Sequence, residues 1–135
     1  MRLADKIAIV TGAASGFGRG IAEAFAAEGA RVVVADIDVA RADEVAATIG
    51  NGALSVGIDV SKKDDVTRLV ETAVDAFGGL DIVVNNAGVT HRNQSLMTVT
   101  EDEFDRIYAV NVKSIYLMTL AVVPELEKRG GGSII

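Results

Sequence analysis

The chain has 135 residues, a formal net charge of −6, one histidine (His91) and no cysteine. The lack of cysteine excludes disulfide bonds, thiolate catalysis, iron–sulfur clusters and cysteine-based zinc sites, and a single histidine excludes a multi-histidine metal site. We therefore expect no metal centre. Nucleic acid is not expected as a partner either, because binding phosphates needs a basic surface.

Half of the residues are hydrophobic and 24% are charged, which is ordinary for one globular domain. Charged residues interrupt the segment Met1–Lys6, so the sequence predicts no signal peptide there. No apolar run approaches the ~20 residues that cross a bilayer. We expect a single cytoplasmic domain over residues 1–135, without a membrane segment.

The first two predicted strands are Ile7–Val10 and Val32–Val34, uninterrupted apolar runs typical of a parallel sheet buried on both faces. The helix between them is expected to run from Gly16 to Gly29. Its predicted inward-facing residues are Ile21, Ala24 and Phe25.

Further helices and strands alternate along the chain. A helix that buries Val45, Ala46 and Ile49 ends at Gly50, and a weaker strand at Ala53–Val56 fits a sheet edge. The next helix is predicted to have Ser61, with Asp64 three residues later, as its N-cap, and to end at Gly78–Gly79. The fourth strand is Ile82–Val84.

Thr100 and Glu103 form a capping box at the start of the last predicted helix. This helix is expected to reach Lys128, with Pro124 disturbing its last turns, and Ser133–Ile135 begins a fifth strand. Regular alternation of this kind predicts an α/β fold with a doubly wound parallel sheet, truncated at the start of the fifth strand.

A glycine-rich turn, Thr11-Gly12-Ala13-Ala14-Ser15-Gly16-Phe17-Gly18, lies between the first strand and the first helix. A lone glycine pattern is often only a tight turn. Between a strand and a helix, however, it favours dinucleotide binding, because the helix N-terminus offers free N–H groups to a phosphate.

Asp36 ends the second strand, 18 residues after Gly18, where an acidic residue holds a ribose 2′-hydroxyl in dinucleotide-binding folds. A carboxylate there repels a 2′-phosphate, and neither Ile37 nor Ser15 supplies a compensating base. The sequence therefore predicts NAD rather than NADP.

Two more strand ends carry polar residues. Asp59, followed by Val60, either meets an adenine amino group or caps the next helix. Asn85 and Asn86, followed by Ala87-Gly88, are expected to bind backbone groups of neighbouring strand ends and brace the crevice.

Asn111 falls on the apolar stripe of the last helix, with Phe104, Ile107, Tyr108 and Ile115, so we expect a buried amide that must find partners. Either local backbone satisfies it and the helix bends, or it faces the ligand crevice. His91 is expected in an exposed loop, and Tyr108 and Tyr116 are expected to be packing residues.

In this order, the glycine turn, Asp36, Asp59-Val60, Asn85-Asn86-Ala87-Gly88 and Asn111 resemble the short-chain dehydrogenase/reductase family over the whole chain. The resemblance implies the Rossmann-type, cofactor-binding half of an NAD(H)-dependent oxidoreductase, which interconverts an alcohol and a ketone or aldehyde by hydride transfer. It also implies that Asn111 is the asparagine of the catalytic tetrad, supporting a proton relay. The implied cofactor-binding residues are Gly12, Ser15, Gly16, Phe17, Gly18, Asp36, Ile37, Asp59, Val60, Asn86, Ala87 and Gly88.

The serine and the Tyr-x-x-x-Lys motif of that tetrad are not in the chain, since Val112 stands four residues after Tyr108 and Leu120 four residues after Tyr116. We therefore expect the 135 residues alone to be inactive. The alternative is a nucleotide-binding module or inactive remnant. The resemblance also implies a small-molecule alcohol or carbonyl substrate and dimers or tetramers associated through the long helix.

Overall fold

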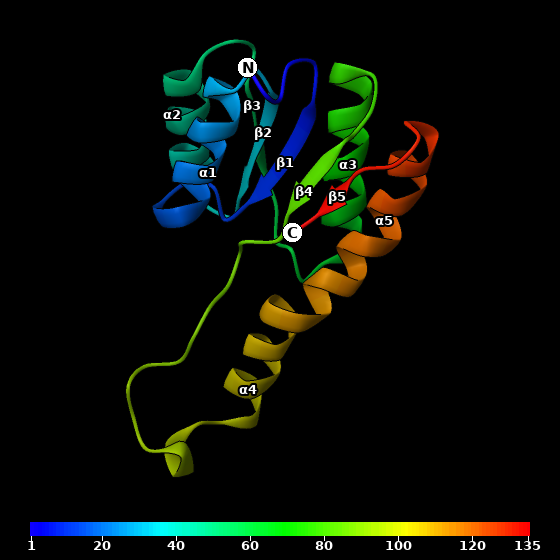
Figure 1. The fold of residues 1–135 in the computed structure, drawn as a ribbon. Coiled ribbons are helices and arrows are strands. Elements are labelled where there is room, and N and C mark those ends of the chain that lie inside the picture. The colour runs from blue at the N-terminus through cyan, green and yellow to red at the C-terminus, as the bar shows by residue number, and fades with distance from the viewer.

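The computed structural model of residues 1–135 is a five-stranded parallel sheet between two layers of helices (Figure 1). Helices α1 and α2 cover one face of the sheet, and α3 and α5 cover the other. The elements in chain order are β1 (Ile7–Thr11), α1 (Gly16–Ala27), β2 (Arg31–Asp36), α2 (Val39–Ile49), β3 (Leu54–Gly57), α3 (Lys63–Phe77), β4 (Ile82–Val84), the 3-10 helix η1 (Leu96–Thr98), α4 (Glu101–Tyr108), the π-helix η2 (Ala109–Lys113), α5 (Ser114–Lys128) and β5 (Ser133–Ile134).

The strand order is β3-β2-β1-β4-β5, which confirms the predicted doubly wound parallel sheet and the edge position of β3. Ile9 in the central strand β1 pairs with Val33 on one side and Val83 on the other. The chain winds outward from β1 to β3 and then returns to place β4 beside β1. This reversal opens a crevice at the carboxyl ends of β1 and β4, where ligands bind in such sheets.

Alternate residues of the central strand supply two cores. Ile7 and Ile9 pack with α3 and α5, whereas Ala8 and Val10 pack with α1 and α2. All four side chains are buried, because a parallel strand covered on both faces has no solvent side.

Most helix ends follow the sequence rules. The Asp38 side chain accepts from the Arg41 N–H and caps α2, and Gly78 ends α3 with a positive φ of 86°. The prediction that Ser61 is the N-cap of α3 was wrong. Helix α3 begins at Lys63 instead, because the Ser61 hydroxyl donates to Asp59 at 2.6 Å.

Helix α1 contains another correction. Ala24 was expected to face inward, but it is exposed, and the buried residues of this helix are Gly18 and Ala22. Ile21 and Phe25 are partly buried against the core, as predicted. Which of several alanines is buried depends on the exact rotation of the helix about its axis. The spacing of apolar residues in the sequence defines that rotation only loosely.

The last predicted helix consists of three segments, α4, η2 and α5. The Thr100–Glu103 capping box is present, and α5 continues through Pro124 to Lys128. The predicted apolar stripe is not buried: Phe104, Tyr108 and Ile115 are 62%, 55% and 45% exposed. Helix α4 extends beyond the sheet edge, so this stripe has no sheet to pack against (Figure 1).

The continuous helix Glu101–Lys128 is long and apolar enough to span a membrane, with a mean hydropathy of 1.4 over its most apolar 18 residues. Asn111 and Lys113 interrupt it, so it contains no uninterrupted apolar run of that length, as expected. Leu117, Met118, Val122 and Leu126 pack in the core against the sheet and α3. Its α5 segment is thus a core helix.

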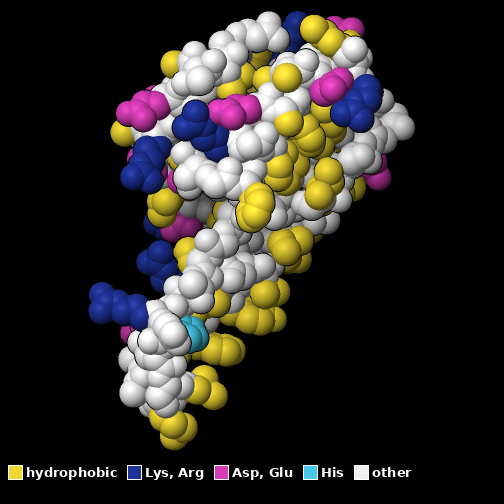
Figure 2. Space-filling model, turned by 60° about the vertical axis from the view of Figure 1, so that its left-hand side comes forward, with side chains coloured by type: hydrophobic (Ala, Val, Ile, Leu, Met, Phe, Trp, Pro, Cys, Tyr) yellow, Lys and Arg dark blue, Asp and Glu magenta, His cyan; other side chains and the backbone are white.

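The loop after β4, together with α4, forms an arm that projects from the body of the molecule (Figure 1). His91 lies in this loop and is half-buried rather than exposed. Hydrophobic side chains gather along one edge of the arm (Figure 2). The exposed large hydrophobic residues of the arm and of the adjoining helix are Leu96, Met97, Phe104, Tyr108, Val112, Ile115, Tyr116 and Leu120. Tyr108 and Tyr116 are thus not core packing residues.

Asp81 joins three parts of the fold at the amino end of the strands. Its Oδ2 accepts from the Ile7 N–H at 2.9 Å and from Arg129 Nη2 at 3.0 Å, and Lys6 Nζ lies 3.7 Å from Oδ1. Its carbonyl oxygen accepts from the Ser133 N–H at the start of β5. Burial alone would raise the pKa of Asp81, but the hydrogen bonds from Arg129 and Ile7 and the two nearby cations hold the pKa below its usual value.

Candidate functional site

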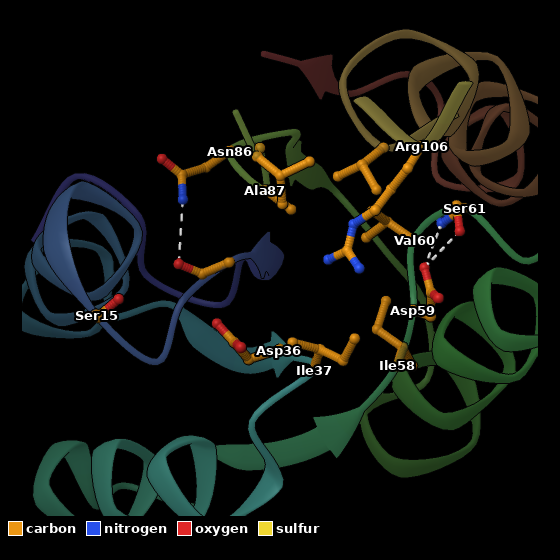
Figure 3. Close-up of a pocket in the computed structure, with 14 residues that line it drawn as sticks. Ser15, Asp36, Ile37, Ile58, Asp59, Val60, Ser61, Asn86, Ala87 and Arg106 are labelled. Carbon is orange, nitrogen blue, oxygen red and sulfur yellow. Dashed lines mark hydrogen bonds between the residues drawn. The ribbon is translucent and has the colours of Figure 1, made fainter. Parts of the chain in front are cut away.

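A cavity of about 430 Å³ lies at the carboxyl ends of β1, β2 and β4, in the crevice where the winding reverses (Figure 3). Polar groups from strand ends and aliphatic side chains share its wall. The lining residues are Gly12, Ser15, Asp36, Ile37, Ile58, Asp59, Val60, Ser61, Asn86, Ala87, Gly88, Val89, Arg106 and Val110.

The glycine turn beside the cavity requires glycine at three positions: Gly12 and Gly16 have a positive φ, of +62° and +55°, and Gly18 has no room for a side chain. Residues other than glycine rarely adopt a positive φ. Gly18 has an ordinary backbone, but a Cβ there would collide with the Gly12 carbonyl oxygen and the Asn86 side chain. At Gly16 a Cβ would meet no atom within 4 Å, so this side of the turn is open to a ligand.

Helix α1 presents free backbone donors at the same turn. Arg19 is the first residue of the helix region whose N–H finds a backbone acceptor, the Ser15 carbonyl at 3.1 Å. The N–H groups of Gly16, Phe17 and Gly18 are unpaired, and the Ser15 side chain caps none of them. Unpaired N–H groups at a helix N-terminus form a ready site for a phosphate.

Asn86 locks the ends of β1 and β4 together, which confirms the predicted bracing. Its Nδ2 donates to the carbonyl oxygens of Thr11 and Gly12 at 3.0 and 3.1 Å. The Thr11 hydroxyl oxygen accepts from the N–H groups of Asn86 and Ala87, each at 3.0 Å. On the other side, the Asn85 N–H donates to the Ile135 carbonyl oxygen at 2.7 Å.

Asp36 reaches from the end of β2 toward the glycine turn. Its Oδ2 accepts from the Ala14 N–H at 3.0 Å, and its Oδ1 accepts from the Asp38 N–H at 2.9 Å. A carboxylate offers about four lone-pair sites, so these two bonds fix its orientation and leave capacity for a ligand diol.

Asp59 is fixed by its own loop. Its Oδ1 accepts from both the N–H and the hydroxyl of Ser61, at 2.9 and 2.6 Å. The Ser61 hydroxyl is the main cause that holds the pKa of Asp59 below its usual value, against a smaller opposing effect of burial. Asp59 therefore organises the turn before α3 and at the same time lines the cavity.

Asn111 is exposed, not buried as expected, yet both ends of its amide are paired. Its Oδ1 accepts from the Val89 N–H and its Nδ2 donates to the Val89 carbonyl oxygen, both at 2.8 Å. The residue lies in the π-helical turn η2, which joins α4 to α5. Asn111 thus does not line the cavity, but it fixes the loop residue Val89, which does.

Nine of the predicted cofactor residues line the cavity, and Gly16, Phe17 and Gly18 form the turn beside it. Phe17 points away and is 89% exposed. Sequence reasoning missed five lining residues. Four of them stand beside residues that were singled out: Ile58, Ser61, Val89 and Val110. The fifth, Arg106, has no such neighbour.

Arg106 also corrects the premise that no basic residue accompanies Asp36. It reaches the cavity from α4, far from Asp36 in the sequence (Figure 3). The premise holds only for residues that are close to Asp36 along the chain.

Comparison with known proteins agrees with this geometry. A family model described as short chain dehydrogenase matches residues 6–135. The chain belongs to the short-chain dehydrogenase/reductase family. The resemblance drawn from the motifs is thereby confirmed.

Several relatives of this short-chain dehydrogenase/reductase chain show how much of the family fold it covers. It is 46% identical to 4-formylbenzenesulfonate dehydrogenase of Comamonas testosteroni, with 100% of this chain and 55% of the relative aligned. Galactitol 2-dehydrogenase of Agrobacterium fabrum is 43% identical, over 100% of this chain and 53% of the relative.

Among solved structures, 3-ketoacyl-(acyl-carrier-protein) reductase from Brucella melitensis, complexed with NADH, superposes with a TM-score of 0.92 and 49% identity. The match covers 95% of this chain and 53% of that one. The chain therefore spans about half the length of the relatives it matches.

Proposed function

We propose that the chain is the NAD-binding half of an oxidoreductase that interconverts an alcohol and a ketone or aldehyde. The observation that carries the proposal is the cavity at the carboxyl ends of β1, β2 and β4, with a glycine turn on one side and the fixed Asp36 carboxylate on another. The complex of a 49% identical reductase with NADH supports the choice of cofactor class.

The residues present fit a dinucleotide in chemical terms. The free N–H groups of Gly16, Phe17 and Gly18 would hold the pyrophosphate, and the open space beside Gly16 admits it. Asp36 would accept from the ribose diol, and Asp59 with Val60 would border the adenine. Asn86, Ala87 and Gly88 would border the cofactor on the β4 side. The nicotinamide supplies hydride transfer when bound.

We expect NAD(H) to bind more tightly than NADP(H), because a 2′-phosphate beside Asp36 meets a fixed carboxylate. The repulsion and lost hydrogen bonds should cost on the order of 1–3 kcal/mol. Both cofactors should be titrated by calorimetry against wild type and Asp36→Ala, in the protein expressed from its complete reading frame. The variant should lose most of the preference, and equal wild-type affinities would refute the assignment.

Asn111 should matter for turnover more than for cofactor affinity. Asn111→Leu removes both hydrogen bonds to Val89 and frees the loop beside the cavity. We expect kcat to fall about tenfold or more, as misplacement of a positioned group does, while the Kd for NAD stays within about threefold. An unchanged kcat would mean that the amide only ties the loop to η2.

The remaining catalytic groups would have to come from outside these residues, since the chain has no Tyr-x-x-x-Lys motif. We propose that residues 1–135 form the cofactor-binding domain of a longer cytoplasmic enzyme that acts on a small alcohol or carbonyl compound. Ketone-dependent oxidation of NADH by the complete protein would support this proposal. Tight NADH binding without any such oxidation would favour the alternative of a nucleotide-binding module.

We also propose that the protein associates as a dimer or tetramer. The apolar edge of the arm and the exposed residues Tyr116 and Leu120 of α5 support this proposal, because a contiguous apolar surface of this kind marks an interface.

A further inference from the structure

Arg106 is the single cation among the residues that line the cavity. It comes from the last turn of α4, and Figure 3 shows its guanidinium directed into the cavity, toward the wall formed by Ile37 and Ile58. Its side chain makes no hydrogen bond and no ion pair with any residue of the chain. The guanidinium is therefore available to a ligand.

The opposite wall favours a flat apolar ligand group. Ile37, Ile58 and Val60 are aliphatic and line the cavity; Ile37 and Ile58 lie below the guanidinium and Val60 lies beside it (Figure 3). A planar aromatic ring placed between them would bury one face on methyl and methylene groups and present the other face to Arg106. A guanidinium is itself planar and stacks on aromatic faces, which a lysine ammonium cannot do.

The charges of the cavity favour an uncharged ring over a phosphate at this position. Asp36 and Asp59 face the same space, and the pKa of Asp59 is held below its usual value, so this carboxylate is ionised at neutral pH. Two carboxylates against one guanidinium leave the wall net negative, which opposes an additional phosphate.

Resting on the proposed function, we propose that Arg106 binds the adenine ring of the cofactor, stacking its guanidinium on the ring face opposite Ile37 and Ile58. Helix α4 would then contribute to cofactor affinity through Arg106, in addition to the strand ends and the glycine turn.

The test is calorimetry on the protein expressed from its complete reading frame, with NADH, AMP and 2′,5′-ADP as ligands. Arg106→Leu should weaken NADH and AMP by the same factor, about five- to tenfold, which is the range of a partly desolvated cation–π contact. Arg106→Lys keeps the charge but not the planar guanidinium. It should therefore weaken binding by about half as much as Arg106→Leu does, on a logarithmic scale. Arg92→Leu, an equal charge change at an exposed loop residue that does not line the cavity, should leave all three affinities unchanged.

The variants are expected to fold, because the exposed Arg106 side chain has no intramolecular partner to lose. AMP affinity in Arg106→Leu equal to or tighter than in wild type would overturn the proposal and leave the proposed function standing. A larger loss for 2′,5′-ADP than for AMP would also overturn it, since the arginine would then bind a phosphate. A wild type that binds neither NADH nor AMP would refute the proposed function itself.

Discussion

Gly18→Ala should destabilise the protein by about 3 kcal/mol and abolish tight NADH binding. The added methyl group would collide with the Gly12 carbonyl oxygen and with Asn86 Nδ2, which are themselves joined by a 3.1 Å hydrogen bond. Relief of the collision requires the turn to move away from β4, and this movement displaces the free N–H groups of α1. Urea unfolding and NADH calorimetry measure the two effects.

Gly20→Ala is the matched control, two residues further along the same helix. A Cβ at Gly20 would meet no atom within 4 Å, so this substitution should stabilise the protein by about 0.5–1 kcal/mol through helix propensity alone. NADH affinity should not change. If Gly18→Ala proved as stable as Gly20→Ala, the inference that the glycine turn lies too close to β4 for a methyl group would be contradicted.

Asp81→Asn should cost about 2 kcal/mol in the free energy of unfolding. The substitution keeps an acceptor for the Ile7 N–H but removes the charge that pairs with Arg129 and Lys6. The cost is smaller than for a fully buried pair, because Arg129 and Lys6 are 37% and 51% exposed and can hydrate when left alone. Glu23→Gln, which breaks the surface pair with Arg19, should cost below about 0.5 kcal/mol.

Asp81→Asn should also change how the free energy of unfolding depends on pH. Because the pKa of Asp81 is lower in the folded protein than in the unfolded chain, its contribution is complete above the unfolded pKa. It is lost as the pH falls through the lower, folded pKa. Asp81→Asn should therefore remove part of the acid destabilisation of the wild type. Equal slopes of stability against pH below the unfolded pKa would contradict this account.

The features that sequence could predict are those set by residues close together in the chain. The Thr100–Glu103 box and the glycine ends of α2 and α3 each depend on a few neighbouring residues. The buried strands could also be predicted from the sequence, because a strand covered on both faces appears as a continuous apolar run. The parallel, doubly wound character of the sheet followed from the alternation of strands and helices, whereas the full strand order came from the structure.

The errors concern partners that are chosen in three dimensions. Ser61 could cap a helix, but Asp59 competes for its hydroxyl and the helix begins later. Asn111 fits an apolar stripe, but the stripe lies on an arm beyond the sheet, so it has no core to enter. Arg106 carries no motif at all, since only the path of α4 past the strand ends brings it to the cavity.

Hydrogen–deuterium exchange of the complete protein, with and without saturating NADH, tests most directly whether the cofactor binds in this cavity. Exchange should be slower in peptides that cover Gly12–Gly18, Asp36–Ile37, Asp59–Ser61 and Asn86–Val89, because these segments line or border one cavity. The amino end of the strands around Asp81 should exchange as before. Protection confined to other segments, or no protection at NADH concentrations that saturate binding, would contradict the assignment of this cavity as the cofactor site.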